Sequence, residues 1–380
     1  MEFTLTEDQK MLKSMVKDFA DKELEPVAAR VDEESMYPAE NIKKMAELGL
    51  MGVPFPEKYG GSGGGELAFI IVEEELSRVC ASTGTVYFVT SGLAGQPLYM
   101  FGNEEQRQRF VPPVAAGEKI SAFGLTEAGA GSDPAAMETT ATRTKGGYIL
   151  NGTKIFITNG AEAEISVVFA TVDKNLKHKG IIALAVESNS PGYSVGKHEH
   201  KLGIRGSSTT ELIFQDCFVP ETNRLGSEGE GFVIALKSID ASRVSVAAQS
   251  VGIAQGAFDK ALAYSKERRQ FGKSLSEFQA IQWMLADMAT QLDAARLLTY
   301  RAAWLQDNGL PFVKEASMAK VYAAEVSSFV TNKSLQIYGG YGYVKEYPME
   351  RYLRDAKITE IYEGTSEMQR MTIARQLLKD

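Results

Sequence analysis

A glutamate near the C-terminal end is the residue best placed for chemistry. Glu363 lies between the apolar pair Ile361-Tyr362 and Gly364, just before a stretch of helical character. Apolar neighbours would remove the carboxylate from water, which raises its pKa and makes it a stronger base. Ser366 and Gln369 have the spacing of a capping box, which would direct the N–H groups of a helix start toward this turn. An exposed turn glutamate fits the same residues, so the residues alone leave both interpretations open.

Other common catalytic patterns are missing from the sequence. No GxGxxG follows a predicted strand, and there is no GxSxG or HExxH. Residues 147–152 have P-loop spacing, but Thr153-Lys154 replaces the required Lys-Ser/Thr, so a hairpin turn is favoured. His198 and His200 would share one strand face without a third ligand, so no metal site is expected. With only 3 histidines, acid–base chemistry has to come from carboxylates, lysines or tyrosines.

Length and composition narrow the class of protein. A chain of 380 residues exceeds one ordinary core, so two or three packed domains are expected. Hydrophobic residues at 44% and charged residues at 24% are typical of globular proteins. The net charge of −8 disfavours a nucleic-acid partner, whose binding depends on phosphate neutralisation. Cys80 and Cys217 stand alone, which indicates a reducing compartment.

Two segments bear on localisation. Residues 1–5 lack the basic and apolar regions of a signal peptide. The uncharged run 79–103 is long enough to cross a bilayer, but glycines and a proline interrupt it and its apolarity is too low. We therefore expect a helix buried in a soluble, cytoplasmic protein with no membrane span.

The chain divides into three parts, which together must position Glu363. This organisation predicts an α+β multidomain architecture. Residues 1–119 are predicted to form an N-terminal α-helical domain, beginning with the capping box Thr6-Glu7-Asp8-Gln9. Residues 120–230 carry short β-like runs between turn signals such as Asn151-Gly152. They predict a central antiparallel β-sandwich or barrel, because no helix long enough for a parallel crossover separates them. Residues 231–380 are predicted to form a four-helix bundle, with helices over 232–269, 276–307, 312–338 and 366–378.

Three motifs resemble the signatures of the acyl-CoA dehydrogenase family. The first is Phe123-Gly124-Leu125-Thr126-Glu127 with Gly129-Ala130-Gly131-Ser132-Asp133. The second is 268–273 with Phe278-Gln279, and the third runs from Arg354-Asp355-Ala356-Lys357 to 361–365. The resemblance covers essentially the whole chain and is greatest to the bacterial short-chain (butyryl-CoA) branch, notably at 338–343. Ala128 departs from it, since the family usually has Pro there.

The resemblance implies an oxidoreductase acting on CH–CH donors. Such an enzyme uses FAD to convert a short-chain acyl-CoA thioester to the trans-2-enoyl-CoA and passes electrons to electron-transferring flavoprotein. Glu363 would take the Cα proton while the Cβ hydride goes to the flavin. The backbone N–H of Glu363 and a flavin ribityl hydroxyl would stabilise the enolate oxygen. Ser242 occupies the position where a minority branch places its base and cannot serve as one.

The resemblance also implies the remaining site residues and the assembly. Arg268 and Gln279 would reach the FAD of a neighbouring subunit, in a homotetramer built as a dimer of dimers. Gln336, Gly339 and Gly340 would lie near the adenosine. The full set implied for FAD is Phe123, Leu125, Thr126, Ser132, Phe156, Ile157, Thr158, Arg268, Gln279, Gln336, Gly339, Gly340, Thr365 and Glu367. The set implied for acyl-CoA is Ser132, Asp240, Arg243 and Gly364.

Alternatives remain at the level of the sequence. The same residues would serve an enoyl-CoA reductase that runs the chemistry backwards, or an acyl-CoA oxidase that uses O2. A non-catalytic helical scaffold is a third hypothesis.

Overall fold

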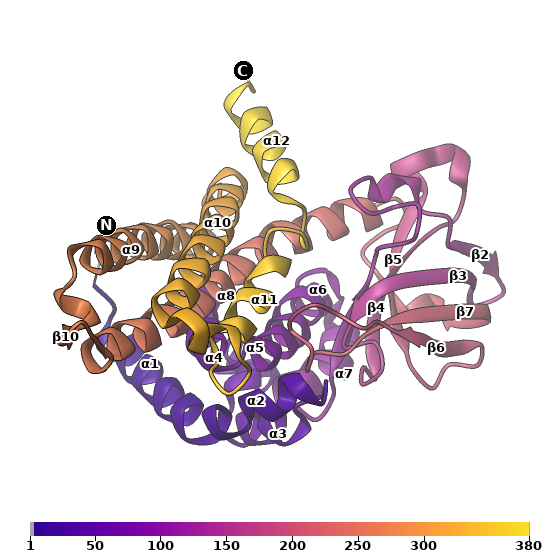
Figure 1. Cartoon of the computed structure of the whole chain (residues 1–380). Helices are drawn as coiled ribbons and strands as arrows, with labels where there is room; N and C mark the ends of the chain where they lie inside the picture. Colours follow the sequence, from indigo (N-terminus) through magenta and orange to yellow (C-terminus); the bar gives the residue numbers. More distant parts are fainter. Residues whose placement is uncertain (1–3, 380) are drawn as a thin grey trace.

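The computed structural model describes residues 4–379. Residues 1–3, part of the segment expected to carry no targeting signal, and Asp380 lie outside the described residues. The chain forms a helical N-terminal part, a β-sheet part and a helical C-terminal part (Figure 1). The predicted α–β–α order is confirmed. The two helical parts pack together at one end of the molecule, and the sheet occupies the other (Figure 1).

The N-terminal part buries most of the long uncharged run inside helices. Its elements are α1 (Glu7–Phe19), a π-helix η1 (Ala20–Leu24), α2 (Glu25–Glu33), α3 (Ala39–Glu47), α4 (Gly65–Val79), α5 (Ala81–Tyr87), a second π-helix η4 (Phe88–Ala94), α6 (Gly95–Phe101) and α7 (Glu104–Ala115). The capping box between Thr6 and Gln9 forms as predicted. All residues of α5 and η4 are buried. Within the described part of the chain, no helix combines the length and apolarity needed to cross a membrane.

The central part is one mixed sheet. Its strands are β1 (Ser121–Gly124), β2 (Thr140–Thr144), β3 (Gly147–Thr158), β4 (Ile165–Thr171), β5 (Ile181–Glu187), β6 (Tyr193–His198), β7 (Thr209–Pro220) and β8 (Arg224–Leu225). The order is β6-β7-β3-β2-β4-β5-β8, with β1 also on β4. Most pairs are antiparallel, as expected, but β4 pairs in parallel with β1 and at one position with β2. The β2–β3 hairpin and its loops connect β1 to β4, so these parallel pairs need no crossover helix.

The predicted turn at Asn151-Gly152 is wrong. The two short runs on either side belong to one strand, β3, and Asn151-Gly152 forms a bulge in its pairing with β7. Gly152 has φ +148°, and a Cβ there would lie 2.5 Å from Thr139 Oγ1, so only glycine fits. A second register shift follows between Lys154 and Ile157, and Phe156 within it has φ +56°.

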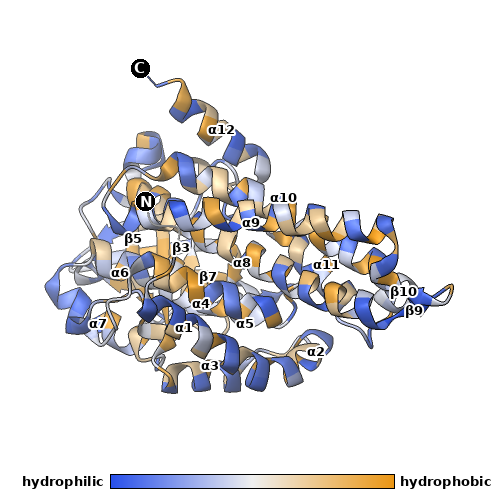
Figure 2. Cartoon of the chain, turned by 90° about the vertical axis from the view of Figure 1, so that its left-hand side faces the viewer, coloured by the Kyte–Doolittle hydropathy of each residue, from blue (hydrophilic) through white to orange (hydrophobic). Residues whose placement is uncertain are grey.

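The C-terminal part contains the predicted long helices and one helix that sequence reasoning missed. The elements are α8 (Gly231–Glu267), α9 (Gln279–Asp307), α10 (Val313–Tyr338), α11 (Met349–Ile358) and α12 (Ser366–Leu377). A small ribbon of β9 (Arg269–Gln270) and β10 (Lys273–Ser274) joins α8 to α9. Helix α11, which carries the Arg354-Asp355 motif, was not predicted. Helix α12 projects away from the body of the molecule (Figures 1 and 2).

The helical parts share one hydrophobic core. Helix α8 lies so close to α4 that a Cβ on Gly252 would be 2.3 Å from Glu74 O, and one on Gly256 would be 2.0 Å from Arg78 O. Hydrophilic residues cover outer helices such as α7, and hydrophobic residues gather toward α4 and α8 (Figure 2). Because α8 is fixed against α4, it is a rigid support for the side chains that it carries toward Glu363.

Candidate active site

Glu363 lies in a left-handed turn between α11 and α12. Its φ is +52°, and Gly364 follows with φ +89°. A left-handed conformation costs a non-glycine residue of order 1–3 kcal/mol, so surrounding contacts must hold it. The buried side chain of Gln369 provides two of them: its Nε2 donates to Glu363 O at 3.1 Å and to Gly364 O at 2.8 Å.

The helix that follows, α12, begins at Ser366 as predicted, but its cap differs from the expected one. Thr365 is the N-cap, and its Oγ1 accepts from Met368 N at 3.4 Å. The predicted Ser366–Gln369 capping box is therefore wrong. Ser366 already lies inside α12, which leaves the Gln369 side chain free to reach the two turn carbonyls.

The Glu363 carboxyl is half-buried between two cations. Removal from water raises its pKa to about 7. Arg243 and Lys320, with the side chain of Ser242, act in the opposite direction by stabilising the ionised form. A carboxyl with this pKa holds a proton or releases it near neutral pH, which is the behaviour required of a general base.

Arg243 lies inside the protein beside this turn. Its side chain is buried, and its Nη1 donates to Asp240 Oδ1 at 2.6 Å on the same helix, α8. It also lies 3.4 Å from Ser317 Oγ of α10. A Cβ on Gly364 would be 3.7 Å from Arg243 Nη2, so the guanidinium borders the base turn directly.

Lys320 of α10 completes the cluster and was missed at the sequence level. It is fully buried, and its Nζ donates to Gly364 O at 2.7 Å. Burial lowers its pKa to about 8. One feature of the sequence could have revealed Lys320: it is a single cation among small apolar residues that lie at helical spacing. These neighbours, all of them buried, are Ala316, Ala319, Ala323 and Ala324.

Tyr362 connects the turn to the N-terminal helices. Its hydroxyl donates to Gln249 Oε1 of α8, and Gln249 Nε2 donates to Thr85 Oγ1 at 2.8 Å. The Tyr362 ring meets Phe88 of the π-helix η4 edge-on, with centroids 6.1 Å apart. π-Helical turns are frequent at functional sites, and here η4 lies against the residue before the base.

The first expected flavin motif lies on the other side of η4. Ser121 Oγ donates to Thr90 O at 2.7 Å, and Asn159 Nδ2 donates to Thr90 Oγ1 at 3.1 Å. The start of β1 and the end of β3 are thus fixed to η4. Since η4 also contacts Tyr362, the base turn and the first motif flank the same element.

The side chains of this motif divide into buried and exposed groups. Phe123 and Leu125 are buried, Thr126 and Thr158 are half-buried, and Ser132 is exposed. Ile157 packs into the core of the sheet, so it can offer only its backbone to a ligand. Phe156 is 60% exposed at the bulge in β3. A large exposed aromatic ring on a bulge and a left-handed residue is typical of a functional site.

A buried ion pair lies beneath this motif. Lys154 is fully buried, and its Nζ donates to Glu127 Oε1 at 2.7 Å and to Leu125 O at 3.2 Å. Glu127 also accepts from the backbone N–H of Glu138 at 2.6 Å and of Thr139 at 3.0 Å. The pair therefore fixes the 125–127 loop to β3 and to the chain before β2.

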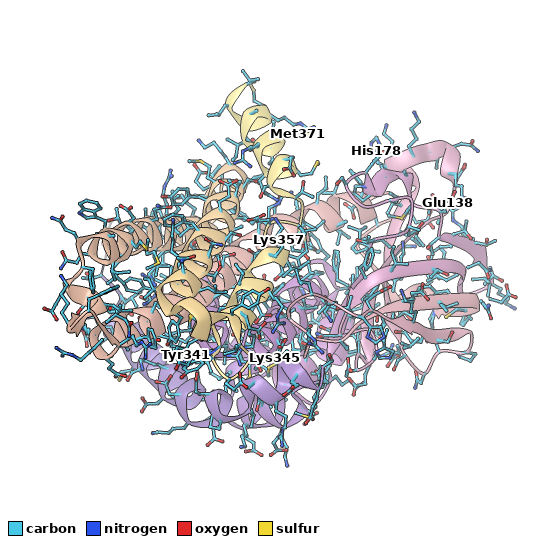
Figure 3. The ribbon with its side chains drawn as sticks, in the orientation of Figure 1. Glu138, His178, Tyr341, Lys345, Lys357 and Met371 are labelled. Carbon is cyan, nitrogen blue, oxygen red and sulfur yellow. The ribbon has the colours of Figure 1, made fainter. Side chains whose placement is uncertain are left out.

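Other expected flavin contacts gather elsewhere, around a cavity of about 500 Å³. Arg268, Gly339 and Gly340 line it together with Tyr264, Tyr338 and Tyr341. Gln279 and Gln336 are exposed and are not among the residues that line it. Figure 3 shows Tyr341 among the helices at one end, and Glu138, which follows the first motif, at the sheet end. A single chain therefore holds the expected FAD residues in two separate groups.

The remaining motif residues have mixed positions. Glu367 is exposed in the first turn of α12, where a backbone N–H and the Thr365 hydroxyl lower its pKa. Arg354 bridges Asp32 of α2 and Leu202 O, and Asp355 Oδ1 accepts from Ile204 N at 2.5 Å. These two motif residues join α11 to the N-terminal and central parts of the chain, which positions the turn that α11 leads into.

Three family models together match nearly the whole chain. They are the N-terminal domain of acyl-CoA dehydrogenase at residues 6–118, its middle domain at 122–217 and its C-terminal domain at 229–378. The chain belongs to the acyl-CoA dehydrogenase family. Members of this family are flavoproteins, and the enzyme is an oxidoreductase acting on CH–CH donors.

Individual proteins agree with this assignment. The chain is 50% identical to a short-chain specific acyl-CoA dehydrogenase of Clostridium acetobutylicum, over the full length of both. It is 49% identical to an acryloyl-CoA reductase (NADH) of Anaerotignum propionicum, over 100% of this chain and 96% of that protein. A solved structure from work on the electron transferring flavoprotein of Acidaminococcus fermentans and flavin-based electron bifurcation matches with a TM-score of 0.99 and 50% identity, over 100% of both chains. The expected likeness to bacterial short-chain members is confirmed.

The buried pair Lys154–Glu127 gives the first testable prediction. Glu127→Gln removes the charge that balances a fully buried ammonium group and weakens its hydrogen bonds. We expect the free energy of unfolding to fall by about 3 kcal/mol, because breaking a buried pair leaves one charge uncompensated. Urea unfolding followed by circular dichroism measures the change.

The matched control is Glu7→Gln, which breaks the exposed pair with Lys10 at 2.8 Å. Exposed pairs contribute at most about 1 kcal/mol, so this variant should unfold close to the wild-type midpoint. Equal midpoints for the two variants would contradict a structural role for the buried pair.

Proposed function

We propose that the chain catalyses the FAD-dependent α,β-dehydrogenation of a short-chain acyl-CoA to the trans-2-enoyl-CoA, with electrons passed to an electron-transferring flavoprotein. The observation that carries the proposal is the Glu363 carboxyl, which lies between Arg243 and Lys320 with a pKa of about 7. The short-chain preference follows the Clostridium acetobutylicum relative. We infer the electron partner from the similar Acidaminococcus fermentans structure, which comes from work on an electron transferring flavoprotein.

Glu363 acts as the base for the Cα proton in this proposal. The α-proton of a thioester is a weak acid, so the base needs partial desolvation and the developing enolate oxygen needs donors. Within residues 4–379 the backbone N–H groups of Glu363, Gly364 and Thr365 have no acceptor. The Glu363 N–H is thus free to donate to the thioester oxygen, and Gly364, which has no side chain, permits close approach.

The residues expected to bind FAD form two groups, and the chemistry of both groups fits a flavin cofactor. At the sheet end, the exposed Phe156 ring and the loop that ends at Ser132 form one side. At the other end, Arg268, Gly339 and Gly340 line the cavity of about 500 Å³. When bound, FAD would accept the Cβ hydride. We assign to FAD the full set of fourteen residues given under Sequence analysis, with Ile157 contributing through its backbone.

The separation of the two groups supports assembly of complete FAD sites between subunits. One protomer would contribute the first motif, and its neighbour would contribute Arg268 and Gln279. We propose a homotetramer built as a dimer of dimers in the cytoplasm. We also propose domain boundaries after residues 119 and 230. The first falls between the regions matched by the N-terminal and middle family models, and the second lies close to residue 229, where the region matched by the C-terminal model begins.

For acyl-CoA we propose contacts with Ser132, Asp240, Arg243 and Gly364. Gly364 adjoins the base, and Arg243 borders the same turn from inside the protein. Asp240 is half-buried and paired with Arg243, while Ser132 is exposed on the first motif.

Reduction of an enoyl-CoA is the second candidate, favoured by the identity to an acryloyl-CoA reductase (NADH). The same carboxyl would then return a proton to Cα. Anaerobic bleaching of the purified protein's flavin by butyryl-CoA, with electrons recovered on electron-transferring flavoprotein, supports the dehydrogenase. If crotonyl-CoA rapidly reoxidises the dithionite-reduced flavin and electron-transferring flavoprotein does not, the result supports the reductase. Peroxide release in air would indicate an oxidase.

The base assignment gives the second prediction. Glu363→Gln keeps the size of the side chain but removes the proton acceptor. Turnover of butyryl-CoA should fall by about 10²–10⁴, the usual contribution of a positioned base, while the flavin stays bound. Stopped-flow flavin reduction measures the rate, and the visible spectrum measures flavin content. Glu360→Gln, which alters a neighbouring carboxylate paired with Lys357, is the control. Wild-type rates in Glu363→Gln would refute the assignment.

The pKa of Glu363 gives the third prediction. Only the ionised carboxylate accepts a proton, so kcat/KM should rise with pH and level off above about 7. The pH profile of flavin reduction at low substrate concentration reports this pKa in the free enzyme. The residual activity of Glu363→Gln should lack this rise, and a wild-type rise centred near 4.5 would contradict the burial of the group.

A further inference from the structure

The carbonyl groups of the base turn are all paired with protein donors, in contrast to its N–H groups. Gln369 Nε2 donates to the carbonyls of Glu363 and Gly364, and Lys320 Nζ donates to Gly364 O at 2.7 Å. The next carbonyl, that of Thr365, accepts from Gln369 N at 3.0 Å. We call the side chains of Lys320 and Gln369 the carbonyl clamp.

We propose that the carbonyl clamp positions the catalytic base, with Lys320 as a positioning residue of the reaction. The inference rests on the proposed function of Glu363. By binding the turn through its oxygens, the clamp holds Glu363 and Gly364 in their left-handed conformations. It thereby leaves the backbone N–H groups of the turn free for the thioester oxygen.

Burial makes this arrangement rigid. Lys320 and Gln369 are both fully buried, one on α10 and the other on α12. Helix α12 otherwise projects from the body of the molecule (Figure 1), so the clamp ties its first turn to α10. A misplacement of about 1 Å at a reacting group can cost about a hundredfold in rate, which is the scale of effect expected from loosening the turn.

Lys320 also contributes a charge that Gln369 lacks. The Glu363 carboxyl is faced by Arg243 from α8 and by Lys320 from α10, and Asp240 is paired with Arg243. Glu360 precedes the turn and Glu367 follows it. Desolvation raises the pKa of Glu363, and the Lys320 ammonium opposes that rise. Removal of this cation therefore raises the pKa of the base further, whereas loss of the neutral Gln369 side chain changes only the geometry.

Two variants separate these contributions. In Lys320→Met, kcat for flavin reduction by butyryl-CoA should fall about ten- to a hundredfold with little change in KM. The rise of kcat/KM with pH, which we call the acidic limb of the pH profile, should occur at a higher pH in this variant than in the wild type. In Gln369→Met, kcat should fall on the same scale, but the acidic limb should stay in place. Lys320→Arg keeps the charge and should restore the wild-type limb. Lys333→Met, which changes a lysine farther along α10, is the control and should match the wild type.

A double variant tests whether Lys320 acts through Glu363. If it does, Lys320→Met should cost less rate in the Glu363→Gln background than in the wild type, because only the placement of the turn N–H groups then remains to be disturbed. If Lys320→Met lowered the rate by the same factor in the wild type and in Glu363→Gln, the inference would be overturned. It would also be overturned if Lys320→Met kept the wild-type kcat and pH profile while Glu363→Gln was inactive. Full activity of Glu363→Gln would instead refute the proposed function itself. Flavin content and circular dichroism establish that each variant is folded.

Discussion

One constraint shapes the active end of the molecule: a carboxyl group must lie out of bulk water without losing its ability to ionise. Burial alone would push the Glu363 pKa upward and leave a neutral acid at physiological pH. Arg243 and Lys320 offset that effect, and the resulting value of about 7 lies where a base is useful. The two cations come from different long helices, so the balance depends on how α8 and α10 pack. The close contact of α8 with α4 fixes one of these helices against the N-terminal part.

The β-sheet is connected to this arrangement through a short irregular element. The π-helix η4 contacts Tyr362 on one side, and it is hydrogen-bonded to β1 and to the end of β3 on the other. In a member of a flavoprotein family, such an element is suited to set the spacing between the base and the cofactor-binding residues. Arg354 and Asp355 add a second connection from α11 to the loop at 202–204. Part of the most recognisable sequence motif therefore serves to hold the chain's parts together.

Much of the architecture could be predicted because it follows from local patterns. Helical periodicity located the three long C-terminal helices. At the other end of the chain, the capping box of Thr6 and Gln9 marked the start of α1. The errors came where tertiary contacts override local signals. Asn151-Gly152 has turn chemistry, yet pairing on both sides keeps it within a bulged strand. Ser366 and Gln369 have the spacing of a capping box, but Gln369 is used to bind the turn that precedes the helix. Lys320 was missed because its role depends on a contact 44 residues away along the chain.

The central claim concerns the protonation of a single side chain in the resting enzyme, which can be measured without turnover. Infrared difference spectroscopy of wild type against Glu363→Gln, recorded over a pH series, isolates the carboxyl band of Glu363. A protonated-carboxyl signal that is absent from the variant and titrates with a midpoint near pH 7 is the expected result. A midpoint near the ordinary value of 4.5 would mean that the group is solvated and would contradict the proposed role.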